Sequence, residues 1–351
     1  MDWTNLGSRR RMAVYVEGPG HWRWDRTAGC DDQYWHGDAP LVTAAVHSAG
    51  ICGTDLSVLA GSDPDARYPL VLGHECLVQI ADPGASGLRR GHHALVLPSV
   101  ACGGCAPCLA GEDDCATPAM LGRTHPYGCF RPTLTLPATQ LMPVPRGAAE
   151  RAGPLLEPFA RAVRILRQAA ATPADRLLVF GAGVAGLTVA VAAKALGLPA
   201  PVLLDRFADR GEIATRCGLP SVVTLGGQLD AAYWRDLGPA SIVVDTVSSR
   251  ASATASLAVL APRGRYVAVG PPHARHDVAV SGDLPRAHGV SVIAAGRSMR
   301  ADFAEAIRLA NRPGVDLAPL VTGHYPFDEF QLATRELTRR PERHVKILLQ
   351  P

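Results

Sequence analysis

The sequence predicts an α/β protein in which a doubly wound parallel sheet is joined to a second, mostly β domain. Three observations lead to this class. From about residue 156, short apolar runs alternate with amphipathic helix-like segments, as in a parallel sheet covered on both faces. Before that point, short β-like runs are separated by Gly and Pro, which is typical of antiparallel strands. The length of 351 residues is about right for two domains.

Changes in composition and in the pattern of expected strands and helices give the expected domain boundaries. Residues 1–155 should form the mostly β domain, with a cysteine-rich lobe at about 99–118. Residues 156–292 should form the parallel-sheet domain, and residues 293–351 should return to the first domain. We therefore expect the second domain to be inserted late in a chain whose two ends fold together.

Apolar spacing predicts the individual elements. In the mostly β domain we expect strands at Leu41–Val46, Ala94–Leu97 and, after the return of the chain, His344–Leu349. In the parallel-sheet domain we expect strands at Leu177–Phe180, Pro201–Leu204, Ser241–Val244 and Arg265–Val269, and helices at Glu157–Ala171, Gly183–Leu196 and Ala208–Cys217.

Composition excludes several classes of protein. Hydrophobic residues make up 47% of the chain and charged residues 19%, enough to bury a core, so a disordered chain is not expected. The 35 basic and 32 acidic side chains are spread along the chain, whereas a nucleic-acid-binding protein would cluster its positive charge. No run of about 18 apolar residues is present, so no transmembrane helix is predicted.

Cysteine and lysine usage indicate the setting of the protein. Nine cysteines, four of them close together, fit metal binding in a reducing compartment better than a secreted disulfide framework. The N-terminus also lacks the apolar core of a signal peptide, so we expect a cytoplasmic protein. Only Lys194 and Lys346 among the 35 basic residues are lysines. This excess of arginine is typical of a high-GC bacterium such as an actinomycete.

A glycine-rich turn directly follows the apolar run Leu177–Phe180. In Gly181-x-Gly183-x-x-Gly186, the glycines would permit a tight turn, a close approach of the backbone to a pyrophosphate, and close helix–strand packing. The helix, with Val184 in its first turn, would direct N–H groups and its positive dipole end at the phosphates. The turn predicts a Rossmann dinucleotide site, with tight packing alone as the simpler explanation.

Asp205 ends the second expected strand of this domain, 19 residues after Gly186. Its carboxylate would accept hydrogen bonds from the ribose hydroxyls and repel a 2′-phosphate, which favours NAD over NADP. Arg206 follows at once and could bind such a phosphate, so NADP stays open. Val269 and Arg297, near the ends of later strands, are further candidate cofactor contacts.

The cysteine-rich lobe contains four closely spaced thiols, which allow a loop to wrap four sulfurs around one zinc ion. A disulfide pair is disfavoured by the expected compartment, and an iron–sulfur cluster remains open on spacing alone. We predict a structural zinc. The four candidate ligands are Cys102, Cys105, Cys108 and Cys115.

Other potential metal ligands are dispersed over three segments, Gly50–Asp55, Gly73–Glu75 and Leu156–Pro158. Each has a structural explanation when taken alone: a cysteine as a small core residue, a histidine buried in a core, and a glutamate at a helix N-terminus. Their combination with a cysteine-rich lobe and a dinucleotide turn favours a catalytic metal site. The residues with suitable side chains are Cys52, Thr54, Asp55, His74, Glu75 and Glu157.

These motifs, in this order, resemble those of the zinc-dependent alcohol dehydrogenases of the medium-chain dehydrogenase/reductase superfamily, especially the sorbitol and threonine dehydrogenase branch. The resemblance extends from about Met12 to Pro351. It implies a GroES-like, mostly β catalytic domain and a Rossmann domain. It also implies two zinc ions per chain and NAD, with NADP less expected.

The resemblance implies roles for the dispersed residues. Cys52 and His74 would be ligands of a catalytic zinc, and Glu157 stands where many polyol enzymes have a third ligand. Glu75 would be a neighbouring carboxylate or an additional ligand. Asp55 would orient His74 by accepting its second ring N–H.

The resemblance also implies a proton relay. Thr54 would hydrogen-bond the substrate oxygen, and Ser57 stands where many relatives carry a relay histidine. Zinc would lower the pKa of the alcohol, and hydride would pass to the nicotinamide. Arg210 matches a residue that packs against the adenine in the family.

Some segments depart from the family pattern. Six residues separate Cys108 from Cys115, where relatives usually have seven, so the last ligand could enter at a different angle. His92 replaces the usual aspartate after Gly91, which changes a local turn. The aromatic residues of His21–Trp35 belong either to the core, our preferred interpretation, or to a contact with a partner.

The resemblance suggests a polyol, sugar alcohol, cyclitol or amino alcohol as substrate, and we hypothesise a role in bacterial specialised-metabolite biosynthesis. Two alternatives remain: a reductase, or a non-redox lyase or epimerase, on the same fold, and a non-catalytic cofactor-binding protein. The resemblance also implies a homodimer or homotetramer, with Gly282–Ala295 at the interface. Arginines and a histidine that could contact substrate, or simply lie on the surface, are Arg123, His125, Arg297 and Arg300.

Overall fold

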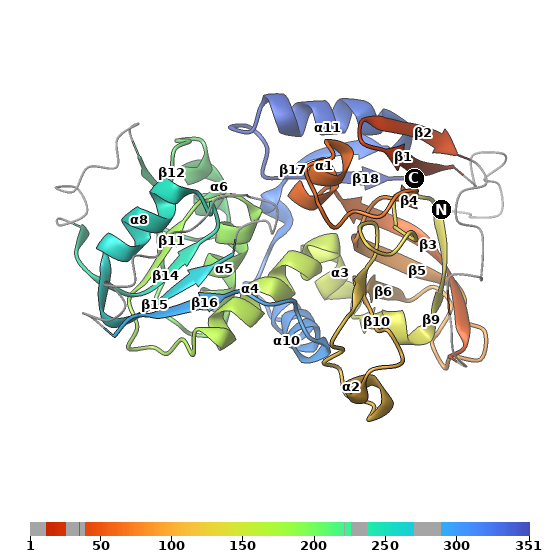
Figure 1. Cartoon of the computed structure of the whole chain (residues 1–351), viewed down its shortest axis with the longest axis horizontal. Coiled ribbons are helices and arrows are strands. Elements are labelled where there is room, and N and C mark those ends of the chain that lie inside the picture. Colours follow the sequence, from red (N-terminus) through yellow and green to blue (C-terminus); the bar gives the residue numbers. More distant parts are fainter. Residues whose placement is uncertain (1–11, 26–34, 36–38, 221, 226–236, 270–288) are drawn as a thin grey trace. The chain divides into compact units, whose positions relative to one another are not determined.

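The computed structural model describes residues 12–25, 35, 39–220, 222–225, 237–269 and 289–351 (Figure 1). The chain splits into two compact units. The first comprises Met1–Glu157 and Val321–Pro351, and the second comprises Pro158–Leu320. The second unit is thus an insertion between two parts of the first.

A six-stranded sheet of parallel neighbours forms the centre of the second unit, in the order β13-β12-β11-β14-β15-β16. Its central strand β11 is buried at every position, as a parallel strand covered on both faces requires. The order reverses direction between β11 and β14, where such sheets bind ligands. The strands are β11 (Leu177–Phe180), β12 (Val202–Asp205), β13 (Val223–Thr224), β14 (Ala240–Asp245), β15 (Leu260–Ala268) and β16 (Ser291–Ala294).

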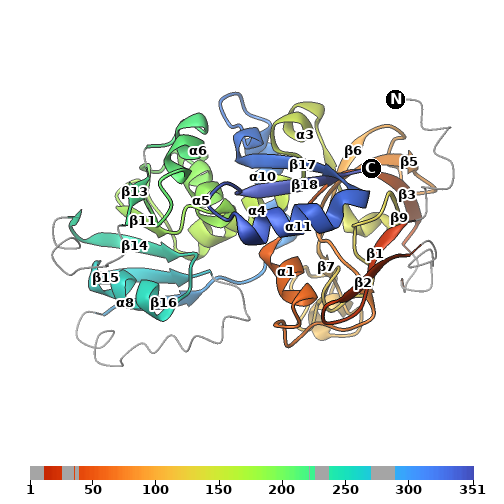
Figure 2. The ribbon, with the colours of Figure 1, turned by 90° about the horizontal axis from the view of Figure 1, so that it is seen from above.

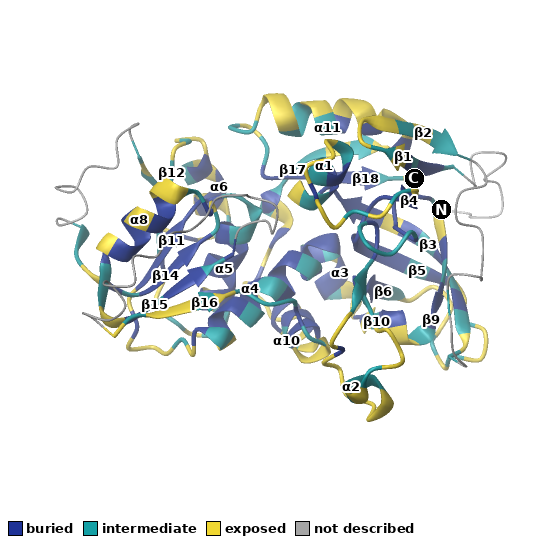
Figure 3. Cartoon of the chain, viewed as in Figure 1, coloured by how far each residue is buried: buried dark blue, intermediate teal, exposed yellow. Residues whose placement is uncertain are grey.

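Helices pack around this sheet. Figure 3 shows the central strands buried, while α8 leaves part of its surface exposed. The alanine-rich α5 is buried along most of its length, which allows it to lie close to β11 and β12. These elements confirm the predicted doubly wound class. The helices are α4 (Leu156–Gln168), α5 (Val184–Ala195), α6 (Arg210–Arg216), α8 (Arg250–Ala258), α10 (Arg300–Ala310) and the 3-10 turn η6 (Ala318–Leu320).

The main sheet of the first unit follows the order β10-β6-β5-β3-β18-β17, with β9 also paired to β3. All its pairs are antiparallel except β17 with β18, which confirms the predicted mostly antiparallel domain. Its strands are β3 (Leu41–Gly50), β5 (Glu75–Asp82), β6 (His93–Val96), β9 (Thr133–Pro137), β10 (Leu141–Val144), β17 (Val321–Pro326) and β18 (Lys346–Gln350).

Two smaller sheets and several short helices complete this unit. One sheet has the order β2-β1-β4 and the other pairs β7 with β8. The strands are β1 (Ala13–Gly18), β2 (His21–Asp25), β4 (Leu70–Val71), β7 (Ser99–Val100) and β8 (Ala119–Met120). The helices are α1 (Gly53–Leu59), α2 (Ala106–Leu109), α3 (Arg146–Ala152), α11 (Phe330–Arg339), and the 3-10 turns η4 (Ala138–Gln140), η5 (Gly153–Leu155) and η7 (Phe327–Glu329).

The C-terminal segment returns to the first unit at a different residue from the one that we expected. Residues 293–320 belong to the second unit, and the return begins at Val321. The reason is that β16 extends the parallel sheet, and Asp302 of α10 accepts a hydrogen bond from Arg167 of α4 at 2.7 Å. After the return, β18 pairs with β3, and α11 lies alongside β17 and β18 (Figure 2).

The described aromatic residues of the N-terminal segment pack against the core. Trp22 meets Phe330 edge to face, with ring centroids 5.1 Å apart, and Trp24 and Trp35 also lie against the same apolar cluster. Trp35 additionally donates its indole N–H to the carbonyl of Thr135 at 2.9 Å. The core interpretation is confirmed for these three tryptophans. None of the helices in the described ranges is long and apolar enough to cross a membrane.

Candidate functional site

Helix α1 places the first group of predicted site residues. It begins immediately after Cys52, and Asp55 in its first turn accepts the backbone N–H of Cys52 at 2.8 Å. The other oxygen of Asp55 accepts the N–H of Gly73 at 3.2 Å. Because Asp55 is fully buried and binds both segments, it fixes Cys52 next to the residue that follows Gly73.

Cys52, His74 and Glu75 form a compact group whose potential ligand atoms all lie within 4.8 Å of one another. Two strands bring them together, because Gly50 of β3 is opposite Glu75 of β5. The side chains of His74 and Glu75 are buried, and Cys52 is half-buried. Sulfur, nitrogen and oxygen donors are the set that zinc prefers, so these residues fit a zinc ion.

His74 has an unusual electrostatic environment. Burial lowers the pKa of its imidazole, but the negative charges of the nearby Asp55 and Cys52 outweigh burial and hold that pKa well above the ordinary value. The Nδ1 atom of His74 lies 3.6 Å from Asp55 Oδ1, which is longer than a hydrogen bond. Within the described part of the chain, this buried nitrogen has no hydrogen-bond partner.

Lys346 is a member of this site that sequence reasoning missed. It is 1% exposed, and its ammonium donates to Glu75 Oε2 at 2.7 Å, to Glu75 Oε1 at 2.9 Å and to the carbonyl of Ile51 at 2.9 Å. Burial lowers the pKa of Lys346, but Glu75 and Cys52 raise it above the usual value. The rarity of lysine in this chain was the one available signal.

Three further predicted residues lie outside the group formed by Cys52, His74 and Glu75. Thr54 Oγ1 lies 3.9 Å from Cys52 Sγ, near the group. The Ser57 hydroxyl donates to the Gly53 carbonyl at 3.0 Å. Glu157 lies in the first turn of α4 and is not a member of the group of ligand atoms within 4.8 Å.

The four cysteines of the lobe form a second group of potential ligands within 4.8 Å of one another. Cys105 Sγ is 3.3 Å from Cys108 Sγ and 3.9 Å from Cys115 Sγ. Hydrogen bonds from the Gly104 backbone, and then from Thr117, lower the pKa of Cys102 to about 6, whereas bonding to Cys105 raises the pKa of Cys108 to about 12. Four converging sulfurs fit a closed, structural zinc site.

The second unit contains a cavity of about 520 Å³ beside the glycine-rich turn. Asp205 closes one side of it, and both its oxygens accept backbone N–H groups, from Ala182 at 2.7 Å and from Phe207 at 2.9 Å. The lining residues include the predicted Gly181, Gly183, Asp205 and Arg210, and also Phe207, Leu225, Thr246, Val247, Ser249 and Ser252, which were not predicted.

The glycines of the turn have distinct packing requirements. A Cβ at Gly186 would lie 1.8 Å from the carbonyl oxygen of Gly181, and one at Gly181 would lie 2.4 Å from Thr246 Oγ1. A Cβ at Gly183 would instead point into open space at the cavity, which is room that a pyrophosphate could use. The cavity therefore fits the phosphate and adenosine part of a dinucleotide.

Other predicted residues lie outside this cavity lining. Val184 begins α5, and the Val269 N–H donates to the Asp245 carbonyl at 2.9 Å. Arg297 is half-buried after β16. Arg123 binds Asp63 through its Nε at 2.7 Å, so this ion pair occupies a side chain considered for substrate binding. Of the proposed interface Gly282–Ala295, residues 282–288 lie outside the described residues.

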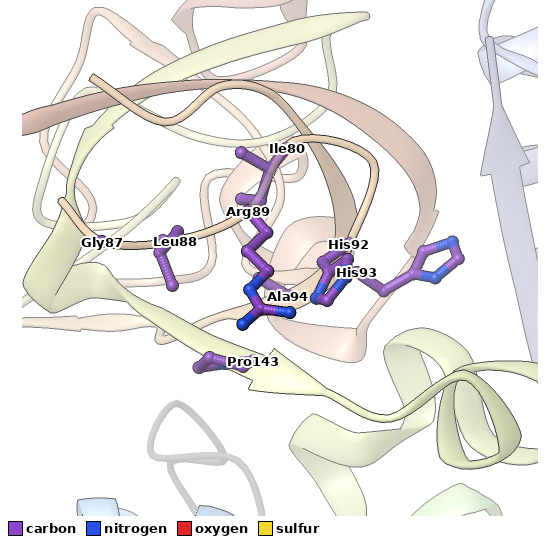
Figure 4. Close-up of a pocket in the computed structure, with 8 residues that line it drawn as sticks. All are labelled: Ile80, Gly87, Leu88, Arg89, His92, His93, Ala94 and Pro143. Atoms are coloured by element: carbon purple, nitrogen blue, oxygen red, sulfur yellow. The ribbon is translucent and has the colours of Figure 1, made fainter. Parts of the chain in front are cut away.

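A smaller cavity of about 200 Å³ lies in the first unit, and Arg89 extends across it towards Pro143 (Figure 4). Its lining combines apolar side chains with one arginine and two histidines, and none of the predicted site residues lines it. The lining residues are Ile80, Gly87, Leu88, Arg89, His92, His93, Ala94 and Pro143.

Comparisons with known proteins agree with this geometry. Residues 39–146 match the family model of the alcohol dehydrogenase GroES-like domain, and residues 183–312 match that of the zinc-binding dehydrogenases. The chain is 30% identical to L-galactonate-5-dehydrogenase of Escherichia coli K12, over 80% of this chain and 83% of that protein. It is 29% identical to a probable D-xylulose reductase A of Aspergillus terreus, over 84% and 87% of the two chains.

The fold is also found among solved structures. An alcohol dehydrogenase of Escherichia coli CFT073, solved with NADH, superposes with a TM-score of 0.84 at 24% identity and covers 97% of this chain and 99% of that one. Both family models, the relative at 30% identity and the two groups of potential zinc ligands indicate the same family for this chain. The chain belongs to the zinc-dependent medium-chain dehydrogenase/reductase superfamily.

Proposed function

We propose that this enzyme transfers hydride between a secondary alcohol of a small polyhydroxylated molecule and NAD. The observation that carries the proposal is the buried group formed by Cys52, His74 and Glu75 in a chain that also has a dinucleotide cavity. The relatives act, by their names, on L-galactonate and D-xylulose, which supports a sugar acid, sugar alcohol or related polyol as substrate. A cyclitol or amino alcohol remains within the same class.

Cys52 and His74 would hold the catalytic zinc, with Glu157 as the proposed third protein ligand. When bound, zinc acts as a Lewis acid that lowers the pKa of the substrate hydroxyl. Asp55 keeps Cys52 and the segment before His74 in register through its two backbone hydrogen bonds. His74 is buried and Cys52 is half-buried, so the proposed ligands are partly shielded from water.

Thr54 and Ser57 are the proposed proton carriers. The Thr54 hydroxyl would accept a hydrogen bond from the substrate alcohol and, as it takes up that proton, release its own through Ser57, a cofactor hydroxyl or water to the solvent. Its closeness to Cys52 Sγ supports this role. Ser57 lies one helical turn after Gly53 and donates to the carbonyl of that residue, so its lone pairs can accept a hydrogen bond. To relay a proton, the Ser57 hydroxyl would have to turn from this carbonyl and release its own proton to water.

Asp205 and Arg210 are the proposed contacts of the adenosine half of the cofactor. The Asp205 carboxylate would accept hydrogen bonds from the ribose hydroxyls. Its negative charge would repel the 2′-phosphate of NADP and so favours NAD. The guanidinium of Arg210 lies 5.9 Å from the centre of the Phe207 ring, on the side of the cavity where an adenine could pack. Val184, Val269 and Arg297 are proposed as further cofactor contacts on the family resemblance.

The proposed setting is a cytoplasmic homodimer or homotetramer. The expected reducing compartment would keep the proposed ligand cysteines available as thiolates for zinc. Among the strands of the described residues, β16 is the last of the parallel sheet, and Val292 on it is 48% exposed, which supports an interface at this side of the sheet. We hypothesise, from the amino-acid composition alone, that the enzyme acts in the synthesis of a specialised metabolite.

The first experiment measures zinc per chain by elemental analysis together with NADH formation on a panel of polyols, sugar acids and amino alcohols. Two zinc ions per chain and NAD-dependent oxidation of one class would support the proposal and identify the substrate class. A single zinc ion, or no hydride transfer to or from any member of the panel, would move the function to the reductase, the lyase or epimerase, or the non-catalytic alternative.

A further inference from the structure

The smaller cavity, in the first unit, has an unpaired positive charge beside it. Its volume is about 200 Å³, and most of its lining comes from the loop between β5 and β6. Arg89 extends from this loop across the cavity, and its guanidinium has no hydrogen bond or ion pair among the described residues (Figure 4). The eight lining residues include no aspartate or glutamate. A guanidinium at a cavity without a carboxylate can bind an anionic ligand.

Strand pairing places the apolar part of the lining on one face of the sheet. Ala94 of β6 is opposite Val78 of β5 and Pro143 of β10, and residues directly opposite one another share a face. Ile80, two positions after Val78, lies on the same face. Ile80 and Ala94 are buried, and Leu88 of the loop packs against the apolar cluster to which they belong. The bottom of the cavity is therefore apolar.

The two histidines of the lining lie on opposite faces of the sheet. The register of β5 and β6 continues to His92, because the Ile80 N–H donates to the His92 carbonyl at 2.9 Å. Opposite residues share a face, so the His92 ring is on the cavity side with Ile80. His93 is on the other face, where its ring centroid lies 5.1 Å from that of His47. Arg89 and His92 are therefore the polar side chains that a ligand in the cavity could contact.

The loop that carries Arg89 is held by its own hydrogen bonds. The Ser86 hydroxyl accepts the Leu88 N–H at 3.2 Å and donates to a backbone carbonyl three residues earlier at 2.6 Å. The Gly91 N–H donates to the Ile80 carbonyl at 2.8 Å. The backbone on both sides of Arg89 is thus fixed before any ligand binds, which lowers the entropy that binding costs.

The carboxylates of this region are engaged with other groups. Asp82, at the end of β5, accepts a backbone N–H of the loop at 3.2 Å, and Glu150 of α3 pairs with Arg146 at 2.8 Å. Where relatives usually have an aspartate, this chain has His92, so the loop lacks a carboxylate that could pair with Arg89 internally. The positive charge of Arg89 is therefore left for a ligand.

We propose that this cavity binds a small organic anion, with its carboxylate or phosphate head on Arg89 and His92 and a short apolar body on the apolar bottom. The planar fork of a guanidinium matches either head, and the imidazole adds an N–H donor. The volume is below the roughly 300–1,000 Å³ of sites for drug-sized ligands, so the ligand has few atoms. A polyhydroxylated body is disfavoured, because its hydroxyls would lack partners on the apolar bottom.

The proposed anion site is separate from the potential zinc ligands. Ile80 and Glu75 are both on β5, and their positions are roughly 17 Å apart along the strand. The lining residues include none of the potential zinc ligands and none of the residues that line the dinucleotide cavity. The anion site therefore does not depend on the proposed alcohol chemistry.

The test measures the binding of four probes to the full-length protein by isothermal titration calorimetry. Benzoate and phenyl phosphate have an apolar body, whereas acetate and inorganic phosphate are the same heads without one. At least one of the two larger probes should bind at least about tenfold more tightly than its smaller counterpart, because only its body can be buried. The larger probe that binds more tightly identifies whether the site prefers a carboxylate or a phosphate head.

Two variants and a matched control locate the bound probe. Arg89→Gln removes the cation and should weaken binding of the preferred probe at least about tenfold. His92→Asp places a carboxylate next to Arg89, which should pair with the guanidinium, repel the probe and cause a loss of similar size. Arg90→Gln removes the same charge from the neighbouring residue, which does not line the cavity, and should change the affinity by less than about threefold. All three positions are exposed, so the variants should keep the wild-type midpoint of thermal unfolding.

Three results would overturn the anion site. The larger probes could bind no more tightly than acetate and inorganic phosphate, which would exclude an apolar subsite. Binding could be unchanged in Arg89→Gln and His92→Asp, which would place the probe elsewhere, for example at the zinc ligands. Arg90→Gln could lose as much affinity as Arg89→Gln, which would show a general attraction to the charged loop. None of these measurements uses turnover or zinc content, so a failure of the proposed function remains distinguishable.

Discussion

The two groups of metal ligands in the first unit are built in opposite ways. The lobe takes four thiols from 14 consecutive residues, all but one of them at least partly exposed. The other group combines β3, α1 and β5, and β18 adds a lysine from near the end of the sequence. A local site carries its geometry in its spacing, whereas a dispersed site acquires it from strand pairing. Loss of a ligand from the lobe should therefore lower the stability of the protein, whereas loss of a ligand from the dispersed group should lower the rate of the reaction.

The largest effect is expected for Cys52→Ala. Loss of a ligand should remove the catalytic zinc, so turnover should fall at least about a thousandfold, which corresponds to the several kcal/mol that a Lewis acid supplies. Zinc content should fall from two ions to one, while the lobe keeps its own. Cys217→Ala, which lies in neither ligand group, is the control. Undiminished turnover in Cys52→Ala would contradict zinc-dependent alcohol chemistry.

Cys108→Ser should have the opposite profile. It removes one of the four lobe thiols, so zinc content should again fall to one, and the midpoint of thermal unfolding should drop by about 5 °C or more. Turnover per folded molecule at low temperature should change by less than about threefold, because the reacting group is untouched. Differential scanning calorimetry and initial rates measure the two quantities. A loss of turnover as large as that of Cys52→Ala would remove the distinction between the two groups.

Asp55→Asn tests whether the dispersed group depends on its supporting hydrogen bonds. An amide has a single acceptor oxygen, so one of the two N–H groups bound by Asp55 would lose its partner, at a cost of about 1–3 kcal/mol of unfolding free energy. Zinc should also leave this site faster. Denaturant unfolding and chelator assays measure both, with the exposed Asp82→Asn as control. An unchanged rate of zinc loss would show that strand pairing alone holds the ligands.

Asp205→Ser extends the comparison to the second unit, where the cavity is also built from sequence-distant residues. Removing the carboxylate removes its repulsion of a 2′-phosphate, so the ratio of kcat/KM for NADP to that for NAD should rise at least about tenfold. Asp209→Ser is the control, since Asp209 is exposed and does not line the cavity. A constant ratio would mean that Asp205 serves only the backbone of its own turn.

The smallest effect concerns the pH dependence of zinc binding in the lobe. Cys102, with its pKa lowered to about 6, is ionised at pH 7, whereas Cys108, with its pKa raised to about 12, must lose a proton to bind zinc. The logarithm of apparent zinc affinity should therefore rise with pH, and its slope should steepen below about pH 6, where Cys102 also binds a proton. Chelator competition between pH 5 and 8 measures the slope, and a constant slope would contradict the assignment.

The sequence contains the parts of the fold that depend on local patterns. The strand Leu177–Phe180 and the turn after it are recognisable because an apolar run meets three spaced glycines, and the structure has that strand at the same residues. The cysteine-rich lobe is recognisable because its four cysteines are closely spaced in the sequence. The end of the second unit was misjudged because nothing local distinguishes an edge strand such as β16 from a strand of the first unit.

The candidate site is only partly predictable for the same physical reason. Cys52 and His74 stand in recognisable motifs, and the structure brings them together. Lys346 could not be assigned a partner, because its contact with Glu75 exists only after β18 pairs with β3. Glu75, expected as a neighbouring carboxylate or an additional ligand, lies in the same group, whereas the role of Glu157 stays a prediction from the family resemblance.

The scarcity of lysine also has a practical consequence. Of the two lysine side chains, Lys346 is buried in an ion pair and Lys194 is exposed on α5. Amine-reactive dyes, crosslinkers and activated supports should therefore attach to the folded protein's side chains at a single point in the second unit. Such reagents would modify one lysine side chain per chain without any engineered residue, in addition to the α-amino group.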